Sequence, residues 1–367
     1  MWRLAPGRCD RRTNARNDGF RHATRNSVRL ACVRADVKAA VVTSADAPWQ
    51  IQDVPSPEPG PNQVVIKIHA SGLCYTDVHQ ALGHFGMPYP MRLGHEPVGE
   101  IVAVGSGVLS RKAGDRVGVP WIQSSCGRCE WCLRGLPQNC PTAVQAAISM
   151  PGGHAEYLLA FADATMLLPD GVSYEQAAPI FCAGYTVYSG LRIAEPQPHE
   201  RVAVVGIGGL GHLALQYAHA AGFHTTAVTS SSDKVELARE LGADDVVKDG
   251  KELARSGGAD VVLATSNSNS AMSDALDALR PDGRLIVMGV DGADRFTFTP
   301  AALLGKRIRV IMSSQNGRRD LFEALAWVAE KKVRVVTETF SLDEIPQAFD
   351  KVASGKIRFR AVILPNA

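Results

Sequence analysis

The sequence of 367 residues lacks any apolar run long enough to cross a bilayer. Its longest apolar stretches, such as residues 202–206 and 261–264, have the length of a strand, whereas a membrane-spanning helix needs about 20 apolar residues. Internal repeats and low-complexity linkers are also missing. With 46% apolar and 21% charged residues, the chain has the composition of an ordinary globular protein of about two domains. We therefore expect no membrane partner.

A strong excess of one charge is missing too. The net charge is +2, but residues 1–36 hold nine Arg, no Lys and three Asp. The remaining residues carry 30 basic and 34 acidic side chains, and hence a charge of −4. Nucleic-acid binding requires a basic face on the folded domain. We therefore expect no nucleic-acid partner.

Residues 1–36 show no strand alternation, no apolar helical stripe and no apolar core of a secretory signal. We predict that this basic N-terminal extension lies outside the fold. A mitochondrial-type presequence would explain the Arg residues, but its three Asp and few Ser oppose that interpretation. We favour a translation start near Val37, which N-terminal sequencing of the native protein would contradict if it found earlier residues.

The eight cysteines leave no surplus pair that requires a disulfide. Cys9 and Cys32 lie in the extension, and the other six lie in contexts typical of metal sites. Such cysteine usage is typical of a reducing compartment. We therefore expect a cytoplasmic protein.

Four of these cysteines stand within 15 residues, in the run CGRCEWCLRGLPQNC. A set of four thiolates fills every coordination position of Zn2+ and leaves none for a substrate. Disulfides or scattered buried thiols are alternatives that the short spacings oppose. The run therefore predicts a structural zinc site, with the ligands Cys126, Cys129, Cys132 and Cys140.

The pattern of secondary structure changes along the chain. Short β-rich runs broken by Gly and Pro extend from Val37 to about residue 170. Strands expected at 201–206, 225–230, 259–265 and 284–289 then alternate with helices expected at 209–222 and 233–241, a pattern typical of a parallel sheet. Two helices, over 320–332 and 338–355, and a strand over 359–364 complete the chain. The fold class is therefore α/β.

A glycine-rich turn follows the first strand of the second region. Gly206, Gly208, Gly209 and Gly211 stand in GIGGLG, between the strand RVAVV and the helix LALQYAHA. In a dinucleotide fingerprint such glycines allow a tight turn, an approach to the pyrophosphate and close packing of helix on strand. The helix N-terminus then faces the phosphates. The turn predicts a nicotinamide cofactor.

The end of the next strand favours NADP(H), with NAD(H) as the alternative. An acidic residue there would hydrogen-bond the ribose 2′-hydroxyl and repel a 2′-phosphate, but this chain has hydroxyl groups and a nearby lysine. The candidates are Thr229, Ser230, Ser231 and Lys234. Alternatively, these serines cap the following helix, with Ser232 as its N-cap. Both interpretations can hold together.

Three further residues have the chemistry of a catalytic metal site. Cys74, His95 and Cys182 would supply two thiolates and one imidazole, with an open fourth position. Each is a weak signal alone, because a buried Cys is usually a small apolar residue and a lone His usually packs or binds water. Their spacing in the sequence alone does not show that the three residues form one site.

The segments GHEPVGEIVAVGSGV, CGRCEWCLRGLPQNC, CAGYTVY and GIGGLG occur in this order. From about Val37 to the C-terminus, the sequence resembles the zinc-dependent alcohol dehydrogenases of the medium-chain dehydrogenase/reductase family. The resemblance implies a GroES-like catalytic domain at 37–183 and 319–367. A Rossmann domain at 184–318 is then inserted into it.

The resemblance also implies roles for single residues. Cys74, His95 and Cys182 would bind a catalytic Zn2+, so that each chain holds two zinc ions. The other implied site residues are Asp77 orienting His95, Glu96 beside the metal, Thr76 at the substrate oxygen, His79 at the far end of a proton relay, Thr186 at the nicotinamide and Arg318 at a phosphate. Alternatives are a turn cap for Thr76, a helix N-terminal carboxylate for Asp77 and a solvated surface group for His79.

The implied activity is the interconversion of primary aliphatic or aryl alcohols and aldehydes by a homo-oligomer, a dimer or a tetramer. By analogy, Trp121, His84, Phe85 and Trp49 are candidate pocket residues, although buried rings usually pack in a core. Tyr75 takes a position where some relatives place Arg against the pyrophosphate. The alternatives are a polyol or secondary-alcohol dehydrogenase, a non-catalytic NADP-binding zinc protein and a zinc-ribbon nucleic-acid module.

Overall fold

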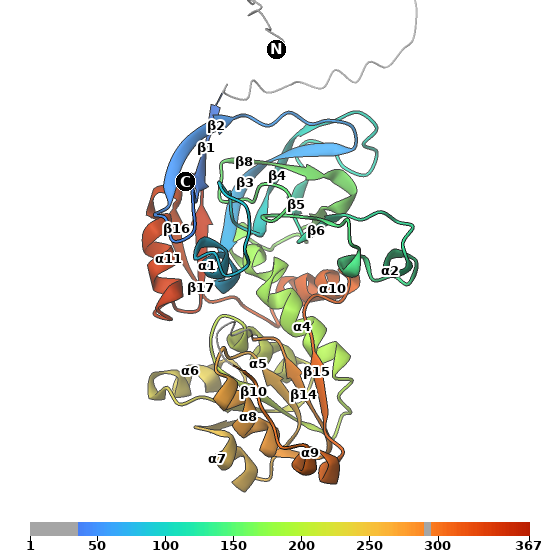
Figure 1. The fold of residues 1–367 in the computed structure, drawn as a ribbon, viewed down its shortest axis with the longest axis vertical. Coiled ribbons are helices and arrows are strands. Elements are labelled where there is room, and N and C mark those ends of the chain that lie inside the picture. Colours follow the sequence, from blue (N-terminus) through green and yellow to red (C-terminus); the bar gives the residue numbers. More distant parts are fainter. Residues whose placement is uncertain (1–35, 290–294) are drawn as a thin grey trace, which may run out of the picture.

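Two sheets organise the chain in the computed structural model, which describes residues 36–289 and 295–367 (Figure 1). A seven-stranded sheet of mainly antiparallel pairs forms the core of one domain, and a six-stranded parallel sheet forms the core of the other. This arrangement confirms the α/β fold class and the pairing of a GroES-like with a Rossmann-type domain. The predictions for residues 1–35 lie outside the described residues.

The seven-stranded sheet has the order β16-β17-β3-β4-β5-β9, with β8 paired to β3. Alternate residues of its long strand β3, such as Ile66 and Ile68, are fully buried, as expected for a sheet with one face on a core. The strands are β3 (Gln63–Leu73), β4 (Glu96–Val104), β5 (Arg116–Gly118), β8 (Tyr157–Phe161), β9 (Met166–Leu167), β16 (Thr337–Ser341) and β17 (Arg360–Leu364). Two hairpin-like pairs flank the sheet, β1 (Asp36–Val41) with β2 (Gln50–Pro55) and β6 (Ile122–Ser124) with β7 (Val144–Gln145).

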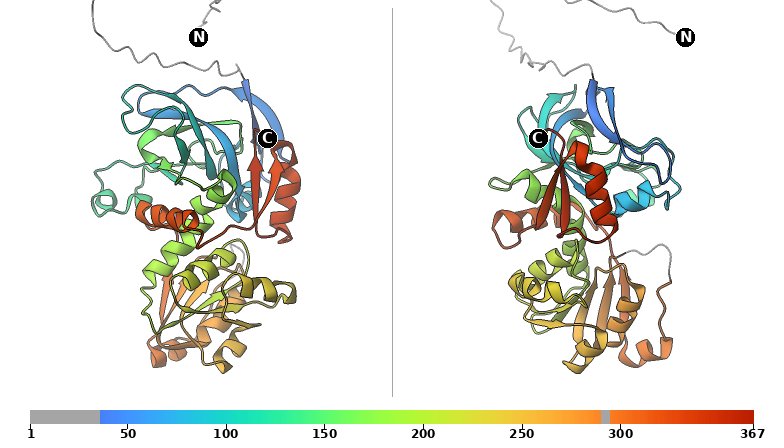
Figure 2. Two further views of the ribbon diagram at one scale, coloured as in Figure 1. Left: turned by 180° about the vertical axis from the view of Figure 1, so that it is seen from behind. Right: turned by 90° about the vertical axis from the view of Figure 1, so that its left-hand side faces the viewer.

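The C-terminal segment returns to this first sheet. Strand β17 pairs antiparallel with β3, with Ala361 opposite Leu73. Helix α11 (Ile345–Ala353) lies beside α1 (Tyr75–Ala81) in all three views (Figures 1 and 2). A strand near the C-terminus therefore lies next to the segment that enters the candidate metal site.

The six-stranded sheet is parallel throughout, in the order β12-β11-β10-β13-β14-β15. Side chains of β10 alternate between two cores: Val202 and Val204 pack with α5 and α10, whereas Ala203 and Val205 pack with α8. Burial on both faces explains why its strands are continuous apolar runs. The elements are β10 (Arg201–Val205), α5 (Gly211–Ala220), β11 (His224–Val228), α6 (Val235–Glu240), β12 (Asp245–Val247), α7 (Gly250–Arg255), β13 (Ala259–Ala264), α8 (Asn269–Asp277), β14 (Leu279–Val287), α9 (Pro300–Lys306) and β15 (Arg309–Met312).

Several elements escaped prediction because their sequence signals are short or mixed. Strand β12 has three residues, and helix α4 (Ala183–Ile193) begins in a run with two glycines. The strands β2, β15 and β16 and the helices α7, α8 and α9 were also missed. The predicted tail ended one residue too late, because Asp36 is the first residue of β1. No helix within residues 36–289 and 295–367 has the length and apolarity that a membrane crossing requires.

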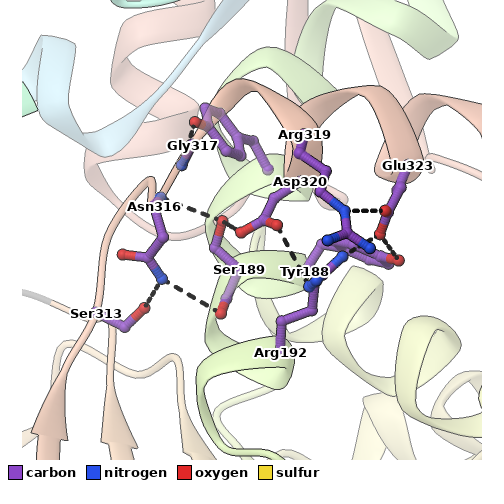
Figure 3. Close-up of polar contacts among 10 residues, drawn as sticks. Tyr188, Ser189, Arg192, Ser313, Asn316, Gly317, Arg319, Asp320 and Glu323 are labelled. Atoms are coloured by element: carbon purple, nitrogen blue, oxygen red, sulfur yellow. Dashed lines mark hydrogen bonds and ion pairs between the residues drawn. The ribbon is translucent and has the colours of Figure 1, made fainter. Parts of the chain in front are cut away.

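The chain passes between the two sheets through α4 and α10 (Arg318–Ala329), and polar contacts join these helices (Figure 3). Ser189 Oγ donates to Asp320 Oδ2 at 2.7 Å, and Arg192 pairs with Asp320 at 3.4 Å and with Glu323. Tyr188 also donates to Glu323, at 2.8 Å. The two crossing helices are thus bonded to each other.

Candidate active site and metal sites

A lobe that projects from the first domain carries the four-cysteine set (Figure 1). Cys129 is the N-cap of the short helix α2 (Glu130–Leu133), Cys132 lies within that helix, and Cys140 ends the following 3-10 turn. The four sulfur atoms, from Cys126, Cys129, Cys132 and Cys140, lie within 4.8 Å of one another. All four are free thiols, and the Sγ atoms of Cys126 and Cys132 are 3.9 Å apart. Four converging sulfurs are the donor set of a closed zinc site.

Backbone N–H groups point at these sulfur atoms. Cys129 N donates to Cys126 Sγ at 3.3 Å, and Cys126 N donates to Cys140 Sγ at 3.5 Å. The bond from the Cys126 N–H, with one from the Thr142 hydroxyl, lowers the pKa of Cys140 to about 6. The pKa of Cys129 moves the other way, to about 11, because the lowering by the Cys132 N–H is outweighed by burial and by the hydrogen bonds among the thiols. Within the lobe, Cys140 therefore favours the thiolate form that binds metals.

A second set of donors is buried. Cys74 directly follows β3 and is the N-cap of α1. His95 directly precedes β4, and Glu96 is the first residue of that strand. Cys182 is the N-cap of α4. One donor atom of each lies within 4.8 Å of the others. The sulfur atoms of Cys74 and Cys182 are 3.8 Å apart although 108 residues separate them in the chain.

The imidazole of His95 tests whether these residues fit a metal ion. Its side chain is 1% exposed, yet neither ring nitrogen has a hydrogen-bond partner among the described residues. Buried polar atoms normally have partners, so a missing one indicates an absent water or ion. Two thiols and an unpartnered imidazole fit a three-ligand zinc site with an open position.

Asp77 lies behind this set, in the first turn of α1. Its Oδ2 accepts from Cys74 N at 2.8 Å, and its Oδ1 accepts from Gly94 N at 2.9 Å. The same Oδ1 is 3.6 Å from His95 Nδ1. Asp77 is therefore both a helix N-terminal carboxylate and a neighbour that can orient the imidazole. Burial alone raises the pKa of Asp77, but the attraction of His95 outweighs it and lowers the pKa.

The thiol and carboxyl groups of the set have shifted pKa values. The hydrogen bond with Cys182 lowers the pKa of Cys74 well below its usual range, and the same contact raises the pKa of Cys182. Burial raises the pKa of Glu96 to about 7, although the charge of Arg360 opposes this shift. Strong shifts of this kind are typical of functional sites.

A cleft of about 640 Å³ separates the metal donors from the glycine-rich turn. Cys74 and Tyr75 line it on one side, and the turn with Gly206, Gly208 and Gly209 lines it on the other. This volume is that of a small-molecule or cofactor site. Other residues of its wall include Thr229, Ser230, Ser231, Lys234, Lys248, Phe359 and Arg360.

Two glycines of the turn are required by its geometry. Gly206 has φ of +87°, the left-handed conformation that glycine adopts without a steric penalty. A Cβ on Gly211 would lie 2.0 Å from the carbonyl oxygen of Gly206, so only glycine lets α5 start this close to β10. Gly208 has open space where a Cβ would point. The turn therefore has the form of a dinucleotide-binding loop.

The comparisons with known proteins agree with this geometry. Residues 60–170 match the alcohol dehydrogenase GroES-like domain, and residues 209–330 match the zinc-binding dehydrogenase family. An alcohol dehydrogenase of Geobacillus stearothermophilus is 40% identical over 336 residues, which cover 89% of this chain and 99% of the relative. The chain belongs to the zinc-dependent alcohol dehydrogenases of the medium-chain dehydrogenase/reductase family.

Solved structures support the assignment. Acetophenone reductase from Geotrichum candidum, in complex with NAD, is 29% identical with a TM-score of 0.82 over 91% of this chain and 98% of that one. A cobalt- and zinc-bound alcohol dehydrogenase from Pyrobaculum aerophilum is 25% identical with the same TM-score over 90% and 100%. This alcohol dehydrogenase therefore belongs to a family of zinc-binding oxidoreductases whose fold these structures share.

Three predicted site residues of this alcohol dehydrogenase lie near the metal donors but outside the wall of the cleft. Thr76 Oγ1 is 3.8 Å from Cys74 Sγ, and Thr186 lies one turn into α4, where its N–H donates to the Cys182 carbonyl. His79 lies on α1 and is 9% exposed, so it is not a solvated surface group.

Arg318, predicted at a phosphate, lies outside the wall of the cleft. Its guanidinium donates to the backbone carbonyls of Asp163 and Thr165, at 2.6 and 3.0 Å, and it does not line the cleft. The arginine in the cleft wall is Arg360, which sequence reasoning missed. Its signal was a charged residue inside the apolar strand FRAVIL. Ser232 is not a helix N-cap either, because a 3-10 turn over Ser232–Lys234 precedes α6.

The candidate pocket aromatics fall into two groups. The ring of Trp121 is 5.1 Å from that of His95, beside the metal donors. The ring of Phe85 is 5.4 Å from that of His79. Trp49 instead packs in the core between His154 and Phe349, with both ring centroids 5.9 Å away. Of these candidate aromatic side chains, Trp121 is the one whose ring packs on a candidate metal ligand.

Proposed function

We propose that this alcohol dehydrogenase interconverts primary aliphatic or aryl alcohols and their aldehydes, with NADP(H) as the preferred cofactor. The observation that carries the proposal is the position of Cys74. This residue belongs to the buried donor set and also lines the cleft that holds the glycine-rich turn. A substrate oxygen at the donor set would thus lie next to a cofactor in the cleft.

Each chain would hold two zinc ions. Cys74, His95 and Cys182 would hold the catalytic one, and the four-cysteine lobe the structural one. The catalytic ion would supply a Lewis acid that lowers the pKa of an alcohol and polarises a carbonyl. Thr76 would hydrogen-bond the substrate oxygen, and His79 would receive the departing proton at the outer end of a relay. Glu96 lies beside the donors and neutralises Arg360.

The wall at the end of β11 supports NADP(H). Thr229, Ser230 and Ser231 offer hydroxyl groups there, and Lys234 and Lys248 offer positive charge for a 2′-phosphate. Asp249, a carboxylate of the wall, accepts the N–H of Glu252 at 2.8 Å as the N-cap of α7. With NADPH as the cofactor, aldehyde reduction would be the favoured direction. A structural relative from Helicobacter pylori, 26% identical, was solved in complex with NADP(H).

The surface and the thiols support two further proposals. Met312 is 70% exposed on β15, which forms the edge of the parallel sheet in the described chain. Open edges with apolar side chains are usually covered, so we expect a dimer or a tetramer, which light scattering would measure.

The six described cysteines are all free thiols, as expected for the reducing cytoplasm.

The proposal is tested by turnover of metal-quantified protein on a panel of primary alcohols, secondary alcohols, polyols and aldehydes. NADP(H) and NAD(H) are compared for each substrate. We expect fastest turnover with primary alcohols and aldehydes and with NADP(H). Preference for secondary alcohols or polyols would support the alternative dehydrogenase class. Full zinc loading without any substrate-dependent change in nicotinamide absorbance would indicate a non-catalytic zinc protein.

A further inference from the structure

Helix α1 ends in a Schellman motif that brings His84 next to His79. The N–H of Gly83 donates to the carbonyl of Gln80 at 3.1 Å, and the N–H of His84 donates to the carbonyl of His79 at 2.9 Å. Gly83 has φ of +80°, the left-handed conformation that this motif requires. The motif places side chains at these two positions in contact. Here both are histidines.

The two imidazoles share a hydrogen bond. His79 Nδ1 lies 2.9 Å from His84 Nδ1, and the ring centroids are 5.2 Å apart. A hydrogen bond between two imidazole nitrogens requires that one carries the proton and the other offers its lone pair. Moving that proton across the bond exchanges donor and acceptor. The geometry of the pair therefore allows a proton to pass from one ring to the other.

The two rings differ in their access to water. His79 is 9% exposed, and the rings of Tyr75 and Phe85 pack on it at 5.0 and 5.4 Å. His84 is exposed. Because His84 is exposed and shares a hydrogen bond with His79, it connects the buried imidazole to solvent.

Helix α1 links this pair to the active site. Its N-cap is Cys74, and Thr76 and His79 stand three residues apart, on one face of the helix. The helix thus begins at the metal donors and ends at an exposed histidine. A proton that moves along this face from Thr76 to His79 arrives one hydrogen bond from His84.

We propose that His84 exchanges the relay proton with bulk water. The proposal rests on the proposed function. Alcohol oxidation breaks one C–H and one O–H bond, forms the carbonyl double bond, transfers a hydride to the nicotinamide and leaves one proton. His79 takes up that proton and passes the one on Nδ1 to His84 Nδ1, and His84 releases a proton to water. Aldehyde reduction runs these transfers in reverse.

The test is a single turnover of the full-length holoenzyme in weak buffer. Nicotinamide absorbance reports hydride transfer, and a pH indicator reports proton release. His84→Gln keeps an amide that can donate to His79 Nδ1 but cannot relay a proton. We expect proton release to slow by at least about tenfold, in line with the usual contribution of a positioned proton-transfer group. Added imidazole should restore the rate, with zinc content and cofactor affinity unchanged.

A matched control removes another exposed histidine. His199 lies in the loop between α4 and β10, and His199→Gln should release protons at the rate of the unaltered enzyme. Unchanged proton release in His84→Gln would overturn the proposal. Slow release that imidazole does not restore would also overturn it and indicate a structural role. If the unaltered protein reduced no cofactor in the presence of alcohols, the proposed function would fail instead.

Discussion

Arg360, at the start of β17, forms an ion pair with Glu96, which follows the metal-ligand candidate His95. The two side chains are 4% and 0% exposed and lie 264 residues apart in the chain. Arg360 also lines the cofactor cleft. The pair therefore ties the C-terminal strand to the metal donors on one side and to the cofactor on the other.

Removal of Glu96 leaves the buried charge of Arg360 uncompensated, and removal of Arg360 leaves a buried carboxyl without its partner. We expect Glu96→Gln and Arg360→Met each to lower the free energy of unfolding by about 3 kcal/mol, because breaking a buried pair costs that much. The double variant should lose less than the sum of both. Urea unfolding of zinc-loaded proteins measures the cycle. Additive losses would show that the two charges do not stabilise each other.

The cofactor preference depends on the end of β11. A carboxylate at position 229 would accept from a ribose 2′-hydroxyl and repel a 2′-phosphate. We expect Thr229→Asp to shift the ratio of kcat/KM for NADP+ and NAD+ towards NAD+ by about tenfold or more. Thr229→Asn, of similar size without the charge, is the matched control. An unchanged ratio in Thr229→Asp would contradict the NADP(H) proposal.

The four-cysteine lobe should stabilise the fold without taking part in the chemistry. Cys132→Ser removes one of the four donors, so zinc content should fall from two ions to one per chain. We expect a lower melting temperature and a single-turnover hydride-transfer rate within about twofold of the unaltered enzyme, because a closed site offers no position to substrate. A large loss of hydride transfer at unchanged stability would contradict this assignment.

His212 predicts a loss of stability in acid. Burial, with the charge of Arg360, lowers the pKa of His212 to about 3. Its Nδ1 lies 3.2 Å from the Gly208 carbonyl, and its Nε2 accepts the N–H of Val336 at 3.4 Å, so the fold holds the neutral ring. The unfolded chain takes up a proton near pH 6.5. The contribution of His212 to the free energy of unfolding is therefore fully present above pH 6.5 and is lost as the pH decreases from 6.5 towards 3.

The variant His212→Gln removes this titration. Between pH 6 and 5, values chosen below the ordinary histidine pKa of about 6.5, the unfolding free energy of the unaltered protein should fall more steeply. The difference in slope should approach about 1.4 kcal/mol per pH unit, the value for one proton. Parallel slopes of the two proteins would show that His212 does not titrate on unfolding.

The sequence predicted the features whose residues are local in the chain. The lobe was predictable because its four donors stand within 15 residues, and the glycine turn because a strand and a helix flank it. Cys74, His95 and Cys182 come from three separate elements, so only the resemblance brought them together. The fold class followed from the alternation of apolar strands and helices.

The features that escaped prediction depend on tertiary contacts. Arg360 reaches the cleft because β17 pairs with β3, a long-range pairing that no local pattern specifies. Another long-range contact places Arg318 against the backbone carbonyls of Asp163 and Thr165, where its guanidinium donates hydrogen bonds to both. The contact between His79 and His84 had a local signal, a glycine one residue before His84 at a helix end.

The catalytic metal set is tested most directly by zinc content and single-turnover hydride transfer in Cys182→Ala. We predict that zinc falls from two ions to one per chain, that cofactor binding stays within about twofold, and that hydride transfer falls by at least about 10³-fold, as expected when a group that stabilises developing charge is lost. Hydride transfer at the rate of the unaltered enzyme, with only the structural zinc remaining, would contradict this prediction.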